Sequence, residues 1–212
     1  MILMKVSIIA PHVDDETLGC GGLLLKLKKQ KVSTSVIFIS ENSSKKLDKI
    51  LNKIKKEYKL KSVYRLKYRP STLDTVSKND LVNKIKNCLI DFKTSDLYIP
   101  NPDDIHSDHY HVFKSSLSAS KWFRNKYIKR ILVYETLSES EILTQNPFNP
   151  NTFIDITDQI KNKIKIMKNY HSEIKNFPFP RSSIAISSLA KLRGSSCGYR
   201  YAEAFKTIFS KE

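Results

Sequence analysis

Two short segments of this 212-residue chain concentrate residues that can hold a metal ion or move a proton. The first reads PHVDDE over residues 11–16, and the second reads NPDDIHSDH over residues 101–109. The chain has only five histidines, and three of them lie between positions 106 and 111. Consecutive acids repel one another and lose hydration when buried, unless a cation or a helix N-terminus compensates their charge. Both segments are therefore candidates for a cation site.

Imidazole nitrogen combined with carboxylate oxygen is a donor set typical of Zn²⁺, and three protein ligands leave a fourth position open for water. His12 and Asp15, joined by a histidine of the second segment, would form such a set. Asp14 would then remain free to act as a general base. Each segment alone has a simpler interpretation, because acids commonly begin helices and Asp-rich loops commonly form turns. Their occurrence together favours the metal site.

The rest of the chain indicates how these two segments are positioned. Short apolar runs are expected to form strands at residues 6–10, 32–40, 62–66, 97–99 and 131–134. Amphipathic stretches between and after them are expected to form helices at residues 16–30, 47–58, 81–92, 109–121 and 156–170. Continuous apolar strands separated by helices are typical of a parallel sheet that is covered on both faces.

This alternation predicts the α/β class: a single Rossmann-like, doubly wound, mostly parallel sheet with helices on both faces. No repeat or linker divides residues 1–212, so we expect a single domain. In such sheets ligands bind at the carboxyl ends of the strands, near the point where the strand order reverses. Each of the two segments follows a predicted strand, so the fold would bring them to the same edge.

The two segments resemble the paired signatures of one family. Residues 11–16 are similar to PHPDDE, and residues 106–109 to HPDH, of the PIG-L/LmbE-like zinc-dependent N-deacetylases, which include N-acetylglucosaminyl deacetylase-like proteins. Shorter similarities, among them Tyr134-Glu135 and residues 201–205 (YAEAF), extend the resemblance along nearly the whole chain. The resemblance implies a hydrolase that removes an acetyl group from an N-acetylated amino sugar or its nucleotide or lipid conjugate.

The resemblance also implies a metal site and a base. His12, Asp15 and His109 match the family's zinc ligands, and Asp14 matches its general base, which takes a proton from water. The implied cofactor is Zn²⁺, although another divalent transition metal would suit the same donors. On this basis, Asp14→Asn is expected to bind metal but lose activity, whereas His12→Ala is expected to lose the metal.

Two further residues and two departures complete the comparison with the family. His106 matches the histidine that stabilises the developing oxyanion or assists as an acid, and Asp108 matches an acid that orients a neighbouring imidazole. Val13 and Ser107 replace prolines of the two signatures, which changes the stiffness of the loops rather than the ligands. Outside the resemblance, Arg69 follows the third predicted strand and is a weaker candidate for binding substrate.

The net charge of +16, from 37 Lys and Arg against 21 Asp and Glu, suggests other functions. Nucleic-acid binding is one alternative, but lysines spread through most of the predicted helices rather than gather with aromatic residues. A metal-dependent phosphoesterase is another, but such enzymes usually bind two metal ions and need more bridging carboxylates than this sequence places. We therefore expect a small-molecule substrate rather than nucleic acid, with most of the lysines forming a solvated coat.

The cysteines and the hydropathy suggest where the protein works. Three cysteines, Cys20, Cys88 and Cys197, lie far apart without the spacing of a disulfide framework or a thiolate metal site, which favours a reducing compartment. No run approaches the ~18 apolar residues of a membrane span. We expect a cytoplasmic protein without an integral membrane segment, and the sequence leaves its oligomeric state open.

Overall fold

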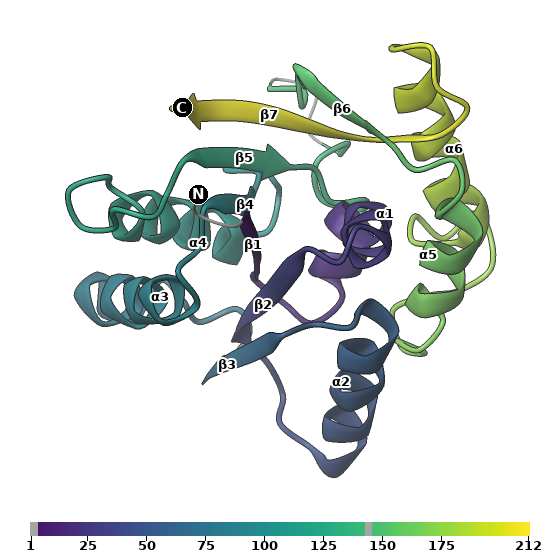
Figure 1. Cartoon of the computed structure of the whole chain (residues 1–212). Coiled ribbons are helices and arrows are strands. Elements are labelled where there is room, and N and C mark those ends of the chain that lie inside the picture. The colour runs from purple at the N-terminus through teal and green to yellow at the C-terminus, as the bar shows by residue number, and fades with distance from the viewer. Residues whose placement is uncertain (1–3, 143–145) are drawn as a thin grey trace.

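The computed structural model describes residues 4–142 and 146–212. Within them a seven-stranded sheet has the order β3-β2-β1-β4-β5-β7-β6 (Figure 1). Five strands are parallel: β1 (Lys5–Ala10), β2 (Ser33–Ser40), β3 (Ser62–Tyr68), β4 (Asp96–Pro100) and β5 (Arg130–Tyr134). The sheet ends in β6 (Thr152–Asp155) and β7 (Ala202–Ser210), and β7 runs antiparallel to both of its neighbours.

Helices cover both faces of this sheet (Figure 1). On one face lie α3 (Lys78–Phe92) and α4 (Ser107–Ala119); on the other lie α1 (Asp15–Lys29), α2 (Lys45–Tyr58), α5 (Ile160–Met167) and α6 (Ser183–Ser195). Successive strand residues point to opposite faces, so Ile8 joins the apolar cluster under α1 while Ile9 joins the cluster under α3 and α4. The predicted α/β fold with a mostly parallel, doubly wound sheet is confirmed.

The C-terminal third differs in detail from what the sequence predicts. The helix expected over residues 156–170 is shorter, because α5 spans only Ile160–Met167. Its apolar stripe is nevertheless buried at both ends, at Ile156 and Tyr170, since the flanking turns keep these side chains against α1. β6 and β7 were not expected as strands. β7 is buried only over its first four residues, so its pattern is not the continuous apolar run of a central strand.

Helix α1 lies unusually close to the sheet. A Cβ atom on Gly19 would come within 2.3 Å of the Tyr134 ring, and one on Gly22 would come within 2.5 Å of Ile156. Such distances leave no room for a side chain, so glycine is required at both positions. The close approach fixes α1, at whose start the first acid-rich segment ends, relative to β5 and the turn after β6.

A buried ion pair fastens α1 to the C-terminal elements. Glu203 on β7 accepts hydrogen bonds from the backbone N–H groups of Gly22 and Leu23, each at 2.7 Å. The ammonium group of Lys163 on α5 lies 2.7 Å from Glu203 and donates to the carbonyl of Leu18, also at 2.7 Å. Lys163 and Glu203, which are 40 residues apart in the sequence, thus hold the middle of α1 together. Among the residues described here, no helix is long and apolar enough to cross a membrane.

Candidate metal centre and active site

The two acid- and histidine-rich segments meet at the carboxyl edge of the sheet. β1 and β4 are neighbours in the strand order, although β2 and β3 separate them in sequence. The chain leaves β1 towards α1 on one face and leaves β4 towards α4 on the other. This is the point where the strand order reverses, and a doubly wound sheet opens a crevice there. The position of the site is the one that the topology predicts.

His12, Asp15 and His109 bring one ligand atom each to within 4.8 Å of the others. The oxygen Oδ2 of Asp15 lies 3.4 Å from Nδ1 of His12 and 3.4 Å from Nε2 of His109. Asp15 and His109 are almost fully buried, whereas the side chain of His12 remains 20% exposed at the mouth of the site. The three groups thus converge on one point that opens towards solvent through His12.

Two more carboxylates hold the second nitrogen of each imidazole. Oδ2 of Asp104 lies 2.6 Å from Nδ1 of His109, and Oδ2 of Asp108 lies 3.0 Å from Nε2 of His12. Each carboxylate accepts the proton of the nitrogen it faces, so in the neutral rings the lone pairs lie on Nε2 of His109 and Nδ1 of His12. The Nε2 atom of His109 is buried and has no hydrogen-bond partner among the described residues. A divalent cation fits these donors, because a lone pair aimed at a carboxylate oxygen is otherwise repulsive.

The charges within this cluster are strongly coupled. Burial lowers the pKa of His109, but Asp15 and Asp104 outweigh it and raise that pKa to about 10. Burial likewise lowers the pKa of His12, while the hydrogen bonds with Asp108 and Asp15 raise it to about 9. Burial raises the pKa of Asp15, yet the adjacent His109 holds that pKa well below its usual range. Without a bound cation, the extra protons on His12 and His109 balance the charge of the carboxylates. A bound cation would replace those protons.

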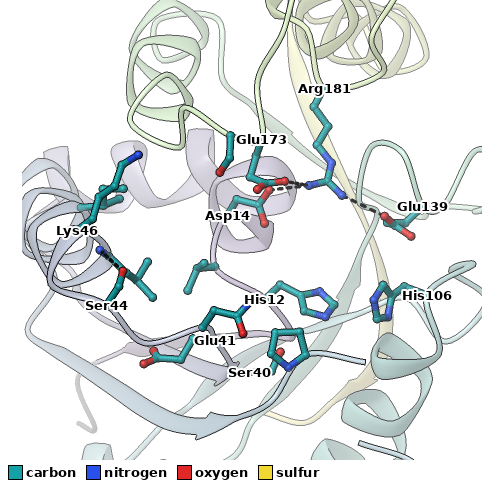
Figure 2. Close-up of a pocket in the computed structure, with 16 residues that line it drawn as sticks. His12, Asp14, Ser40, Glu41, Ser44, Lys46, His106, Glu139, Glu173 and Arg181 are labelled. Atoms are coloured by element: carbon teal, nitrogen blue, oxygen red, sulfur yellow. Dashed lines mark hydrogen bonds and ion pairs between the residues drawn. The ribbon is translucent and has the colours of Figure 1, made fainter. Parts of the chain in front are cut away.

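Asp14 is turned away from the ligand cluster towards an arginine. Its Oδ2 lies 2.9 Å from Nη1 of Arg181 in the loop before α6, and its side chain is almost fully buried (Figure 2). Burial raises the pKa of Asp14 well above its usual value, Asp15 adds to this, and Arg181 opposes it. The backbone of Asp14 has φ 122°, which is uncommon for a residue other than glycine. That conformation points neighbouring carboxylates in different directions, one to the histidines and one to the cavity.

His106 and Asp108 form the other wall of the site. The rings of His106 and His12 are 4.3 Å apart between centroids. Nδ1 of His106 accepts a hydrogen bond from the N–H of Asp108 at 3.1 Å, so a neutral ring carries its proton on Nε2. Burial, together with His12, lowers the pKa of His106 and favours that neutral form. The carboxylate of Asp108 is anchored by the N–H groups of Ser71 and Leu73, and the imidazole that this carboxylate contacts is His12 rather than His106.

A cavity of about 400 Å³ opens beside these residues (Figure 2). One wall carries His12, Asp14 and His106, and the opposite wall comes from the start of α2 and the loop before it, including Glu41 and Lys46. Figure 2 shows Glu139, Glu173 and Arg181 along the top. Polar and charged residues make up most of the lining, and Val13, Leu47, Ile50 and Pro70 add apolar surface to it.

Sequence reasoning assigned no role to three positions that the structure places at or beneath the candidate site. Asp104 lies within the second segment, and its spacing of five residues from His109 was the available signal. Arg181 contacts Asp14, Glu173 and Glu139 but lies 167 residues after Asp14, and nothing in the surrounding sequence marks it.

Glu16, the third missed position, accepts hydrogen bonds from Thr17 and Tyr170 beneath the site. Arg69 is exposed and does not line the cavity, although the adjacent Pro70 does. Its role in binding substrate stays a prediction.

The fold and this donor set define a doubly wound α/β protein with a candidate His₂Asp metal centre at its switch point. The chain belongs to the PIG-L family: residues 7–120 match the family model described as GlcNAc-PI de-N-acetylase. That match covers more than half of the chain and both acid- and histidine-rich segments. No curated protein sequence matches this chain.

Solved structures share the fold at low sequence identity. The conserved protein TT1542 from Thermus thermophilus is 20% identical, with a TM-score of 0.81 over 99% of this chain and 97% of its own. N,N'-diacetylchitobiose deacetylase from Pyrococcus horikoshii is 20% identical, with a TM-score of 0.78 over 96% of this chain and 83% of its own. GalB, the 4-carboxy-2-hydroxymuconate hydratase of Pseudomonas putida KT2440, is 13% identical, with a TM-score of 0.79 over 99% and 98%. Proteins with this fold therefore differ in the reaction that they catalyse, so a reaction has to be assigned from the residues of the site.

Proposed function

We propose that this protein is a zinc-dependent N-deacetylase that hydrolyses the acetamido group of an N-acetylated amino sugar or of its nucleotide or lipid conjugate. Membership of a family described by de-N-acetylation supports the reaction class. The main support for a bound metal is the Nε2 atom of His109. This atom is buried and has no hydrogen-bond partner among the described residues, and Asp104 holds the imidazole ring in its orientation. His12 and Asp15 would complete the ligand set.

Zn²⁺ bound there would polarise the acetyl carbonyl and lower the pKa of a water molecule. The chain's own groups supply the rest of the chemistry. Asp14 takes the proton of the attacking water, because it is the one acid of the first segment that faces the cavity without contacting a ligand histidine. Burial raises the pKa of Asp14, which makes its carboxylate a stronger base than an exposed one.

His106 and Asp14 complete the turnover. His106 lines the cavity, and its Nε2 lies 3.4 Å from Oγ of Ser71. A proton on this Nε2 donates a hydrogen bond to the oxygen that gains negative charge. Asp14 then gives its proton to the departing amine as the C–N bond breaks. The products are acetate and the free amino sugar, and Asp14 is again a carboxylate.

The test is acetate release from a panel of N-acetyl sugars, nucleotide-linked N-acetyl sugars and lipid-linked N-acetyl sugars. Activity should disappear in a chelator and return when Zn²⁺ is restored. Activity that persists in the chelator would overturn the metal mechanism. Release of no acetate from any metal-loaded sample, with turnover of an unsaturated acid instead, would assign the site to hydration.

The compartment follows from the same proposal. Cys20, Cys88 and Cys197 are all free thiols, as suits a reducing compartment such as the cytoplasm. The substrate is a small molecule in this proposal, and no nucleic acid takes part in the reaction.

A further inference from the structure

About half of the net positive charge lies in the loops at one edge of the sheet. Because β1 to β5 are parallel, the loops that lead from helices into β2, β3, β4 and β5 lie together at the amino edge. These loops, residues 30–32, 59–61, 93–95 and 120–129, are called the basic edge below. They contain eight basic residues and no acid: Lys31, Lys59, Lys61, Lys93, Lys121, Arg124, Lys126 and Lys129.

The opposite edge, which carries the active site, has the reverse balance. Its loops, residues 11–14, 41–44, 69–77 and 101–106, contain five acids and a single Arg. The molecule is therefore electrostatically polar along the strand direction. The lysines at helix C-termini are partly explained by the helix dipole, which favours cations there. The dipole does not explain the apolar groups that accompany them.

The longest of these loops exposes two large aromatic side chains. Trp122, the only tryptophan of the chain, is 65% exposed, and Phe123 is 63% exposed. Their rings meet edge to face with centroids 5.7 Å apart. Lys121 Nζ and Arg124 Cζ each lie 5.8 Å from the centroid of the Phe123 ring. Apolar rings and cations thus form one continuous surface, which a protein does not expose to water without cost.

We propose that the basic edge docks this protein on an anionic lipid surface, with Trp122 and Phe123 at the lipid–water boundary. Aromatic side chains favour that boundary, and Lys and Arg are attracted by the negative potential of anionic headgroups. The loop before β5 projects beyond the ends of the strands (Figure 1). A projecting loop suits a flat surface, whereas single-stranded nucleic acid is usually held in a basic groove.

This docking fixes the direction in which the active site faces. α4 begins at Ser107, directly after His106 of the site, and ends at Ala119, directly before the aromatic loop. Its 13 residues span about 20 Å at 1.5 Å per residue. A docked molecule therefore holds its cavity away from the lipid and open to water. The docking does not depend on the proposed deacetylase reaction, but it implies that this reaction takes a substrate from the aqueous side.

The single tryptophan gives a direct test with the full-length protein. Vesicles of phosphatidylcholine are compared with vesicles that contain about 30% phosphatidylglycerol, an anionic lipid. We expect the Trp122 emission to shift to shorter wavelength and the protein to sediment with the anionic vesicles alone. Binding should weaken as salt is raised, because added ions screen the attraction. An unshifted emission with no sedimentation would overturn the proposal.

Variants distinguish binding through the basic edge from non-specific binding to vesicles. Trp122→Ala with Phe123→Ala, and separately Lys121→Glu with Lys126→Glu, should each weaken sedimentation at least about tenfold. Matched controls change similar groups elsewhere: Ile184→Ala with Leu192→Ala removes two exposed apolar side chains of α6, and Lys161→Glu with Lys168→Glu reverses two exposed lysines at α5. The controls should bind like the wild type.

One control and two further outcomes complete the test. Acetate release from a water-soluble substrate should be unchanged in the aromatic-loop variants, which shows that they fold. Equal loss of binding in the loop variants and the controls would contradict a specific surface. Quenching of Trp122 by an oligonucleotide, with no response to anionic vesicles, would replace the lipid by nucleic acid as the partner.

Discussion

Asp104 and Asp108 decide which nitrogen of each candidate ligand histidine is free. Asp104 contacts Nδ1 of His109 and also accepts hydrogen bonds from Asn101 and Ser140, so its own position is fixed. A carboxylate behind a ligand imidazole orients the ring and increases its basicity. The loss of either should therefore weaken metal binding even though neither residue needs to touch the metal.

We expect Asp104→Asn to lower the affinity for Zn²⁺ about 10- to 100-fold, because an amide is a weaker acceptor for the His109 proton. Competition with a chromophoric chelator measures this affinity. Asp103→Asn is the matched control, since Asp103 is the exposed neighbour and contacts no candidate ligand among the described residues. Equal affinities for the two variants would show that Asp104 does not position His109.

We expect Asp14→Asn to keep its metal and to lose acetate release by roughly 10²- to 10⁴-fold, the usual contribution of a positioned base. His12→Ala should instead lose the metal together with activity. Metal content by elemental analysis and kcat for acetate release separate the two results. Near-normal turnover by Asp14→Asn would show that another group takes the proton.

At the scale of elements, the ion pair of Lys163 and Glu203 joins α5 and β7 to the middle of α1. Both side chains are almost fully buried, at 6% and 5% exposure. A buried ion pair is not in itself strongly stabilising, but removal of one partner leaves an unpaired charge in a dry environment. The C-terminal elements thus contribute to the geometry of the first acid-rich segment, although they supply no candidate metal ligand.

Glu203→Gln should destabilise the protein by about 3–5 kcal/mol, because Lys163 would keep its charge without a counter-ion. The double variant Glu203→Gln with Lys163→Met should recover much of this loss. Urea unfolding followed by circular dichroism measures both free energies. Lys161→Met, an exposed change on the same helix, serves as the control and should lie within about 0.5 kcal/mol of the wild type. A double variant no more stable than Glu203→Gln would contradict the unpaired-charge explanation.

At the scale of the whole molecule, one edge of the sheet gathers acids around a candidate cation site and the other gathers cations around two aromatic rings. The site therefore contains several carboxylates that lose hydration when the chain folds. A cation that binds the folded state alone adds stability of RT ln(1 + [L]/Kd), about 2.7 kcal/mol at a concentration of 100 Kd.

Saturating Zn²⁺ should therefore raise Tm by about 5–10 °C, given roughly 2–4 °C per kcal/mol for a domain of this size. Differential scanning calorimetry with metal and with chelator measures the shift. Asp14→Asn should show the same shift as the wild type, and His12→Ala should show little. A shift that survives in His12→Ala would place the stabilising ion elsewhere.

Much of this arrangement could be predicted from local sequence. The apolar runs at residues 6–10, 32–40 and 97–99 are long enough and uniform enough to be buried strands, and each was found as a strand within a few residues. The parallel topology then places the segments after the first and fourth strands at one edge. His12, Asp15 and His109 do come together there. Their roles as ligands, and those of Asp14 and His106 in catalysis, stay predictions.

The sequence by itself determined the layered fold and the two segments of the site, because burial periodicity and the polar residues after each strand are local properties. Only the tertiary structure decided that Arg181 faces Asp14, that Asp108 orients His12, and that Glu203 reaches α1. These contacts join residues 96 to 181 positions apart, and their geometry depends on how α1, α4 and β7 pack together. Only the tertiary structure also showed the basic edge. Its lysines are spread along the sequence, and they come together because the parallel sheet brings the loops before β2, β3, β4 and β5 to one side.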